Sequence, residues 1–215
     1  MPAMKALLAL AVLLCASGLV TTGCSSSKAK QASAAPAAGP KKLACPDLPS
    51  WRHLANKIDA PVYCPAWLPD PLIGAIGNRW NNINSVSADR SYLESFVWQE
   101  TGPGIGGGEL HVVLRGYPGR TKIPTCRTGG SGSRNVPCFA SPVGRISANG
   151  IGSAVYTVNQ DADQWHVLYA WHHRGSLYTV SEHVAPPFPS ATQVKKNLDR
   201  VMRSLQRLSP QTTGA

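Results

Sequence analysis

Short segments rich in aromatic and β-branched residues recur between residues 83 and 183, and they limit the fold more than any other feature of the sequence. Each has the length and composition of a β-strand, and glycine-containing turns separate several of them. The segments are Tyr92–Gln99, Glu109–Tyr117, Arg145–Ala148, Ser153–Asn159, Gln164–His172 and Leu177–His183. Strands joined by short turns pair with their neighbours in antiparallel fashion. The sequence therefore predicts a mostly antiparallel sheet of short strands.

The last two segments form the clearest hairpin of the chain. A turn at Arg174-Gly175 places His166 opposite His183, and alternation along the strand turns Glu182 to the other face. His172 shares a face with His166 but lies about 20 Å along the strand, so the two cannot bind one ion. Only the facing pair could meet a metal, and we interpret these two side chains as edge or surface groups rather than as ligands.

Two segments outside the strands repeat their apolar residues at helical spacing. The first predicts a short helix over Ser50–Asp59, and the second a longer amphipathic helix over Ser190–Leu208, which Pro210 stops. Such a helix packs its apolar side on a sheet. Its outer face holds the basic residues Lys195, Lys196, Arg200, Arg203 and Arg207. We expect an α+β domain with the C-terminal helix on the sheet and its basic face either solvated or set against anionic lipid or wall polymer.

One glycine-rich loop matches a nucleotide-binding pattern by letters alone. Gly102–Gly107 reads G-x-G-x-x-G, but this fingerprint requires a helix directly after it, whose N-terminus receives the phosphates. The loop leads instead into the predicted strand from Leu110 to Leu114. We therefore expect no dinucleotide site, and no other segment predicts a cofactor.

The chain begins with a charged start and an apolar run. Met1–Lys5 supplies one positive charge, and Ala6–Val20 is a run of the length of a signal-peptide core, short of a membrane-spanning helix. The run ends in Thr21-Thr22-Gly23-Cys24. This ending resembles the lipobox of bacterial envelope lipoproteins, with Thr21 standing where that family prefers leucine. The resemblance implies cleavage before Cys24 and lipidation of its thiol; the alternative is an ordinary secretory peptide cut nearby.

Composition then divides the rest of the chain. After a signal peptide at 1–23, residues 24–44 are rich in Ser, Ala, Pro, Gly and Lys and predict a disordered tether. Residues 45–210 form a single domain by length, followed by a disordered tail at 211–215. Five of the 21 Lys and Arg residues precede the domain, which leaves 16 basic against 11 acidic residues within it. No nucleic-acid-binding motif accompanies this mild excess of positive charge.

Four cysteines fall inside the domain, namely Cys45, Cys64, Cys126 and Cys138. An even number in an exported chain predicts two disulfides, for which three connectivities exist. The nearest-neighbour pairing, Cys45 with Cys64 and Cys126 with Cys138, is favoured because it closes two short loops. Zinc binding by these cysteines is disfavoured, since no Cys-x-x-Cys pair occurs.

The second cysteine loop is polar and carries two arginines. Arg127 and Arg134 lie near the ends of the loop, and guanidinium groups pair well with phosphate or carboxylate. The loop is either an anion-binding element or a solvated hairpin tip held by its disulfide.

A second, broader resemblance covers roughly Pro61 to Leu208. It rests on turn glycines and core aromatics, namely Gly150, Ala154-Val155-Tyr156, Trp171, Gly175, Tyr178-Thr179-Val180 and the closing Ser204-Leu205. These resemble the small α+β domains of unknown function found in bacterial envelope lipoproteins and sensor proteins. The resemblance implies a fold, and it brings no catalytic residues.

The predicted domain carries none of the enzyme motifs sought. Residues 45–210 contain no Gly-x-Ser-x-Gly, His-Glu-x-x-His or Ser-x-x-Lys. We expect a non-enzymatic binding or sensing protein on the extracytoplasmic face of the cell membrane or envelope, attached by lipid, with an envelope protein, lipid or wall polymer as its partner. The alternatives are a lipid carrier with an apolar cavity between sheet and helix, and a metal-dependent hydrolase that uses the histidine hairpin.

Overall fold

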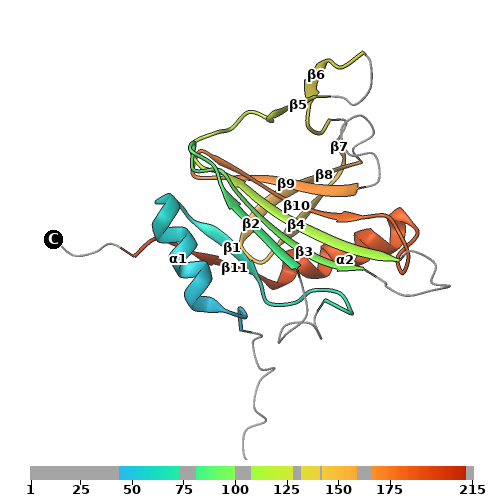
Figure 1. Cartoon of the computed structure of the whole chain (residues 1–215), viewed down its shortest axis with the longest axis horizontal. Coiled ribbons are helices and arrows are strands. Elements are labelled where there is room, and N and C mark those ends of the chain that lie inside the picture. Colours follow the sequence, from blue (N-terminus) through green and yellow to red (C-terminus); the bar gives the residue numbers. More distant parts are fainter. Residues whose placement is uncertain are drawn as a thin grey trace, which may run out of the picture. The chain divides into compact units, whose positions relative to one another are not determined.

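A seven-stranded antiparallel sheet is the centre of the structure (Figure 1). The computed structural model describes residues 44–72, 81–99, 108–127, 132–140, 142–158 and 166–211. Across the sheet the strands follow the order β2-β3-β4-β10-β9-β8-β7. Their bounds are Asn81–Val86 (β2), Tyr92–Gln99 (β3), Glu109–Tyr117 (β4), Pro142–Ala148 (β7), Ile151–Val158 (β8), His166–His173 (β9) and Ser176–His183 (β10). The predicted strands therefore all join one sheet.

The hairpin of β9 and β10 has the predicted register. His166 pairs with His183, and the turn residues Arg174 and Gly175 both have positive φ, 47° and 74°. Glycine adopts this conformation without strain, so Gly175 suits the tight turn that fixes the register.

The edge strand β2 was not among the predicted strands. Three of its six residues are asparagine, a residue type that favours turns over strands. The strand nevertheless pairs with β3 over its whole length. Pairing with a neighbour thus overrides the local preference of this segment.

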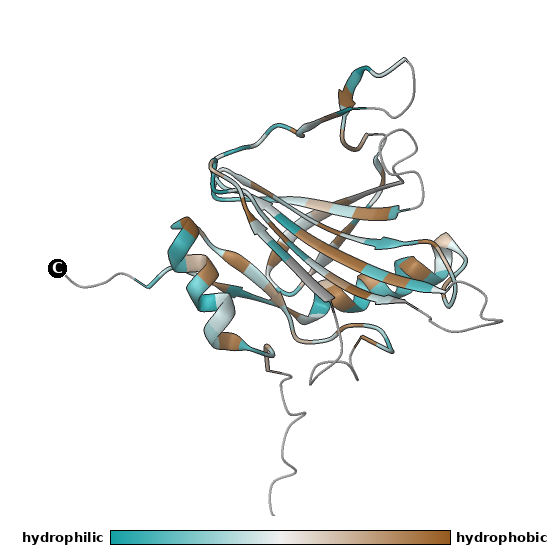
Figure 2. Ribbon diagram, viewed as in Figure 1, coloured by the Kyte–Doolittle hydropathy of each residue, from teal (hydrophilic) through white to brown (hydrophobic). Residues whose placement is uncertain are grey.

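The described residues form two helices, α1 at Leu48–Ile58 and α2 at Ala191–Ser204, and α2 packs on the seven-stranded sheet. α2 lies along one sheet face and buries Val194, Leu198 and Val201 there, while hydrophilic residues alternate with them along the helix (Figure 2). Within the described residues, neither helix is long and apolar enough to cross a bilayer. The helices and the mostly antiparallel sheet confirm the predicted α+β class.

The helix predicted over Ser190–Leu208 is wrong at its C-terminal end. α2 stops at Ser204, and Leu205–Leu208 forms the strand β11, which pairs with β1 at Val62–Pro65. Leu205 is buried, as helical spacing requires, so the apolar pattern alone does not reveal the change. All four residues of β1 are buried, so their backbone groups need hydrogen-bond partners, and an extended β11 provides them.

Two disulfides join Cys45 to Cys64 and Cys126 to Cys138, which is the pairing that the sequence favours. The first connects the residue two positions before the α1 N-cap to β1. The second closes the small hairpin of β5 and β6, at Thr125–Arg127 and Asn135–Pro137. Both crosslinks restrict the unfolded chain and thereby stabilise the domain.

The sheet face away from α2 carries a second, smaller hydrophobic cluster. Phe139, just after the second disulfide, packs with Ala170 of β9 and Leu177 of β10. These two strand residues alternate with Tyr169 and Tyr178, which belong to the main core. The β5–β6 hairpin is therefore attached to the end of this face where Phe139 lies.

Glu182 is a carboxylic acid within the main core, on the α2 side of β10. It is fully buried, and its Oε1 accepts a hydrogen bond of 2.7 Å from the Nδ2 of Asn197 on α2. Burial raises the pKa of this carboxyl from 4.5 to about 8, despite the opposing effect of the Asn197 hydrogen bond. Glu182 is therefore protonated at neutral pH, because the core disfavours its charge.

Replacing Glu182 with glutamine will change how stability depends on pH. The folded protein holds the Glu182 proton up to a pKa of about 8, whereas the unfolded chain releases it near 4.5, so wild-type stability falls between these pH values. The loss is roughly 1.4 kcal/mol per pH unit at most. Glu182→Gln removes this loss, and its stability relative to wild type will rise from pH 5 to pH 8.5 in urea unfolding. Identical pH profiles for the two proteins would show that the carboxyl is ionised in the fold.

Gly116 of β4 leaves space for an aromatic ring, and Gly116→Ala will destabilise the domain. Tyr92 of β3 pairs with Gly116, and its buried ring occupies the place where a Cβ at position 116 would lie. Overpacking of this kind costs about 1–3 kcal/mol. Thermal unfolding of Gly116→Ala, compared with Gly152→Ala, where the added carbon meets open space, measures the loss. Equal melting temperatures would mean that the Tyr92 ring moves aside freely.

Candidate metal centre

Three histidines from neighbouring strands meet at one end of the sheet. His183 of β10 pairs with His166 of β9. On its other side, Glu182 pairs with Val112 of β4, so the next position brings His183 beside His111. One ring nitrogen from each histidine lies within 4.8 Å of the others. We refer to His111, His166 and His183 as the histidine row.

The row lies where three strands begin or end. β4 starts at Glu109, β9 starts at His166, and β10 ends at His183. Because side chains alternate along a strand, the three imidazoles share the sheet face away from α2, while Glu182 points into the core. A fully buried Glu182 agrees with this arrangement. The antiparallel sheet therefore gathers side chains that are far apart in the sequence.

The rings of the row differ in orientation and in burial. The His166 and His183 rings are stacked, with centroids 4.7 Å apart and planes 7° apart. The His111 ring stands at 75° to that of His166, at 5.5 Å. His166 is 6% exposed, whereas the side chains of His111 and His183 are 26% and 24% exposed. The row thus has an inner wall at His166 and a side that is open to solvent.

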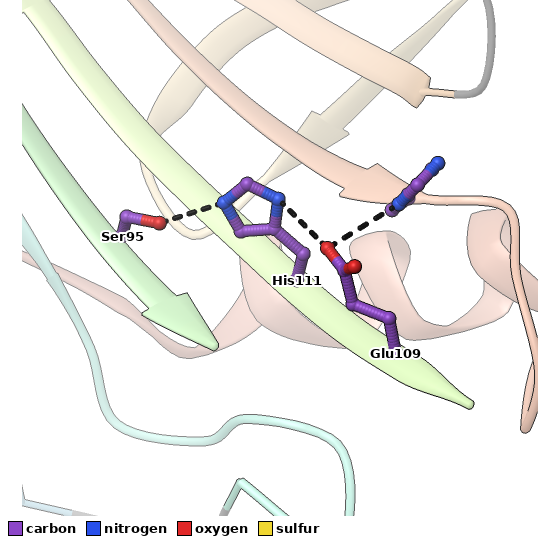
Figure 3. A network of polar contacts seen from close by, with 4 residues as sticks. Ser95, Glu109 and His111 are labelled. Carbon is purple, nitrogen blue, oxygen red and sulfur yellow. Dashed lines mark hydrogen bonds and ion pairs between the residues drawn. The ribbon is translucent and has the colours of Figure 1, made fainter. Parts of the chain in front are cut away.

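A carboxylate stands beside the two more exposed histidines. Oε1 of Glu109 lies 3.6 Å from Nδ1 of His111 and 3.6 Å from Nδ1 of His183 (Figure 3). The backbone N–H of Glu109 donates to the carbonyl of Pro186 at 2.8 Å, which fixes the start of β4 against the segment after β10. Glu109 therefore adds negative charge at the open side of the row.

A hydroxyl holds the opposite edge of the His111 ring. Oγ of Ser95 and Nε2 of His111 share a hydrogen bond of 2.7 Å (Figure 3). Metal-binding histidines commonly make a hydrogen bond through the ring nitrogen that does not bind the metal, and this bond orients the ring. With Ser95 at Nε2, the Nδ1 edge of His111 is turned towards Glu109.

This donor set has the chemistry of a transition-metal site. Imidazole nitrogens suit zinc, copper, nickel and iron, whereas calcium and magnesium prefer sites made of oxygen ligands. Nitrogens around a tetrahedral zinc ion, at bonds of ~2.0–2.1 Å, lie about 3.4 Å from one another. The ligand atoms of the row lie within 4.8 Å of one another, and the stacked rings of His166 and His183 would have to turn towards each other to share an ion, because an imidazole nitrogen binds a metal in the plane of its ring. Three imidazoles would leave the remaining coordination position to water or to Glu109.

No protein-family model, curated protein sequence or solved structure matches this chain. The geometry of the described residues is therefore the basis on which a site is assigned.

The sequence identified two members of the row and missed the third. The facing of His166 and His183 is confirmed, but His166 is buried rather than at an edge or surface. His111 was not considered, because nothing in the sequence says that β4 lies beside β10. The sequence places His111 in the strand segment Glu109–Tyr117 and so shows which residues of that strand share its face. It does not show that this face adjoins the histidines of the β9–β10 hairpin.

Other predicted site residues lie apart from the row. Arg127 in β5 and Arg134, just before β6, are both exposed. Arg127 pairs with Asn135, so the two arginines lie close to each other along the hairpin. Anion binding there stays a prediction. Cys24 and the loop Gly102–Gly107 lie outside the described residues.

Proposed function

We propose that the protein is a lipid-anchored, extracytoplasmic binding protein whose ligand is a divalent transition-metal ion. The observation that supports this most directly is the meeting of three imidazoles from β4, β9 and β10 within 4.8 Å. A surface histidine needs no such neighbours, and a cluster of imidazoles with a nearby carboxylate is a donor set that suits a soft or borderline cation. Zinc is the reference ion for the proposal, since it accepts three histidines and one further ligand.

The location rests on separate support. The apolar run before Cys24 and the small residue Gly23 favour export and lipid attachment. Two disulfides within the described residues suit a compartment outside the reducing cytoplasm. Two acyl chains or more on Cys24 would make the attachment lasting. A metal-binding domain in this place would meet ions before they reach the cytoplasm.

A metal-dependent hydrolase is the second candidate. The open side of the row favours it, because catalytic zinc sites keep three protein ligands and a position for water. Glu109, 3.6 Å from two of the histidines, could take a proton from such a water. Against it, two cavities of about 560 and 370 Å³ among the described residues are lined by other residues and not by the row. We therefore rank ion binding above catalysis.

The lipid-carrier alternative gains no support from the packing of α2. Val194, Leu198, Val201 and Met202 are fully buried against the sheet and occupy the space that a lipid chain would need. A carrier also needs a cavity long enough for an acyl chain, and neither of the two cavities named above lies between α2 and the sheet.

His166→Ala will lower the affinity of the full chain for zinc. His166 is the buried wall of the row, and its loss leaves two ligands from more exposed positions. We expect the affinity for zinc to fall by about tenfold to a hundredfold or more, since changes that only disturb the residues around metal ligands already cost this much. Titration of purified protein with zinc against a chromophoric chelator measures it, with one ion bound per wild-type chain.

His172→Ala is the matched control for this experiment. His172 lies on the same strand and the same face, but it is exposed and its Nε2 contacts the carbonyl of Thr121 instead of the row. The control will bind zinc as tightly as wild type. Equal affinities for wild type, His166→Ala and His172→Ala would contradict metal binding at the row, and so would a wild-type chain that binds no zinc.

A further inference from the structure

α2 presents a row of positive charge on the side that faces away from the sheet. Lys196, Arg200 and Arg203 are exposed and follow one another at steps of four and three residues, one helical face. Thr192 lies one turn earlier on the same face and is also exposed. The apolar residues of the helix are buried on the opposite side. We refer to Lys196, Arg200 and Arg203 as the basic face of α2.

No acid on α2 offsets this charge at the surface. Asp199 is the one acidic residue of the helix. It is half-buried, and its Oδ1 accepts a hydrogen bond of 2.6 Å from the hydroxyl of Tyr169 on β9. Its carboxylate is therefore turned towards the sheet, which leaves the outer side of the helix cationic.

The positive charge extends past the end of the helix. Arg207 of β11 donates to Nε2 of His173 at 2.9 Å, and Arg174 lies close to the same ring. Burial, and then the charges of Arg207 and Arg174, lower the pKa of His173. A histidine whose pKa is lowered beside two guanidinium groups agrees with a positive potential around β11, directly after α2.

An aromatic residue adjoins the basic face. The guanidinium of Arg200 lies over the ring of Trp67, 4.1 Å from its centroid. Trp67 is half-buried, so part of the indole reaches the surface beside Arg200. Tryptophan is enriched in the headgroup region of a bilayer, because that region accommodates both the apolar ring and its N–H group. A cation such as arginine is also accommodated there.

We propose that the basic face of α2 docks on an anionic phospholipid surface, with lipid phosphates as its ligands. Arginine and lysine donate charge-assisted hydrogen bonds to phosphate, and each gains on the order of fivefold in binding near an anionic leaflet. The proposal rests on the membrane attachment in the proposed function and is independent of the histidine row. The sequence predicts a disordered tether of about twenty residues, which would reach roughly 25 Å. Such a tether would hold the domain near the lipid, so that a weak attraction suffices.

Photocrosslinking of the full chain in nanodiscs tests the docking. A photoreactive amino acid replaces Thr192 on the basic face, and in a second protein it replaces His53, an exposed residue of α1. The protein is held by its own amino-terminal anchor in nanodiscs of phosphatidylcholine, with or without phosphatidylglycerol. The mass of the inserted chain reports lipidation of Cys24 separately, so failure of the anchor is distinguished from failure of the docking.

Lipid adducts will form from position 192 in the anionic nanodiscs and not from position 53. Lys196→Gln with Arg203→Gln will reduce them on the order of tenfold or more, as will high salt. The matched pair Arg52→Gln with Lys57→Gln, which removes two exposed charges from α1, will leave them unchanged. Equal adducts in neutral and anionic nanodiscs, or equal loss in the two double variants, would overturn the proposal. The same photoreactive protein can be crosslinked in isolated cell envelopes. Adducts to glycan without adducts to lipid would also overturn the proposal, because wall polymer would then be the partner.

Discussion

The position of β10 between β4 and β9 is the constraint on which the rest of the structure depends. Its two antiparallel ladders bring the ends of three strands to one level, and each strand contributes one histidine there. A slip of one residue in either ladder would send the side chains of that strand to the opposite face. The same registers direct Glu182 into the core beneath α2. One strand therefore determines both the candidate site and the apolar packing behind it.

The two faces of the sheet have different chemistry. The face under α2 is filled by large apolar and aromatic side chains. On the other face, Ser95, Thr179 and Ser181 are buried although they are polar, between the Phe139 cluster at one end and the histidine row at the other. Buried polar groups require hydrogen-bond partners, and Ser95 has one in His111. Such a face suits a small polar ligand such as an ion better than an apolar one.

Local features of this chain could be predicted from the sequence, and contacts between distant segments could not. The register of His166 with His183 follows from a turn of two residues within one hairpin. The approach of His111 to His183 depends on a ladder between β4 and β10, strands separated in the chain by five others. Helical spacing predicted α2 but could not show that Leu205 begins a strand, since the partner strand β1 lies far back in the sequence.

The central claim is that one metal ion binds to three imidazoles. X-ray absorption spectroscopy of the full chain, loaded with one equivalent of zinc, tests this most directly. The account predicts a first shell of four light atoms that includes three imidazole nitrogens at ~2.0–2.1 Å, with the outer-shell scattering typical of histidine rings. A shell of six oxygens, or sulfur neighbours at about 2.3 Å, would contradict the account, because the ion would then lie elsewhere than between β4, β10 and β9.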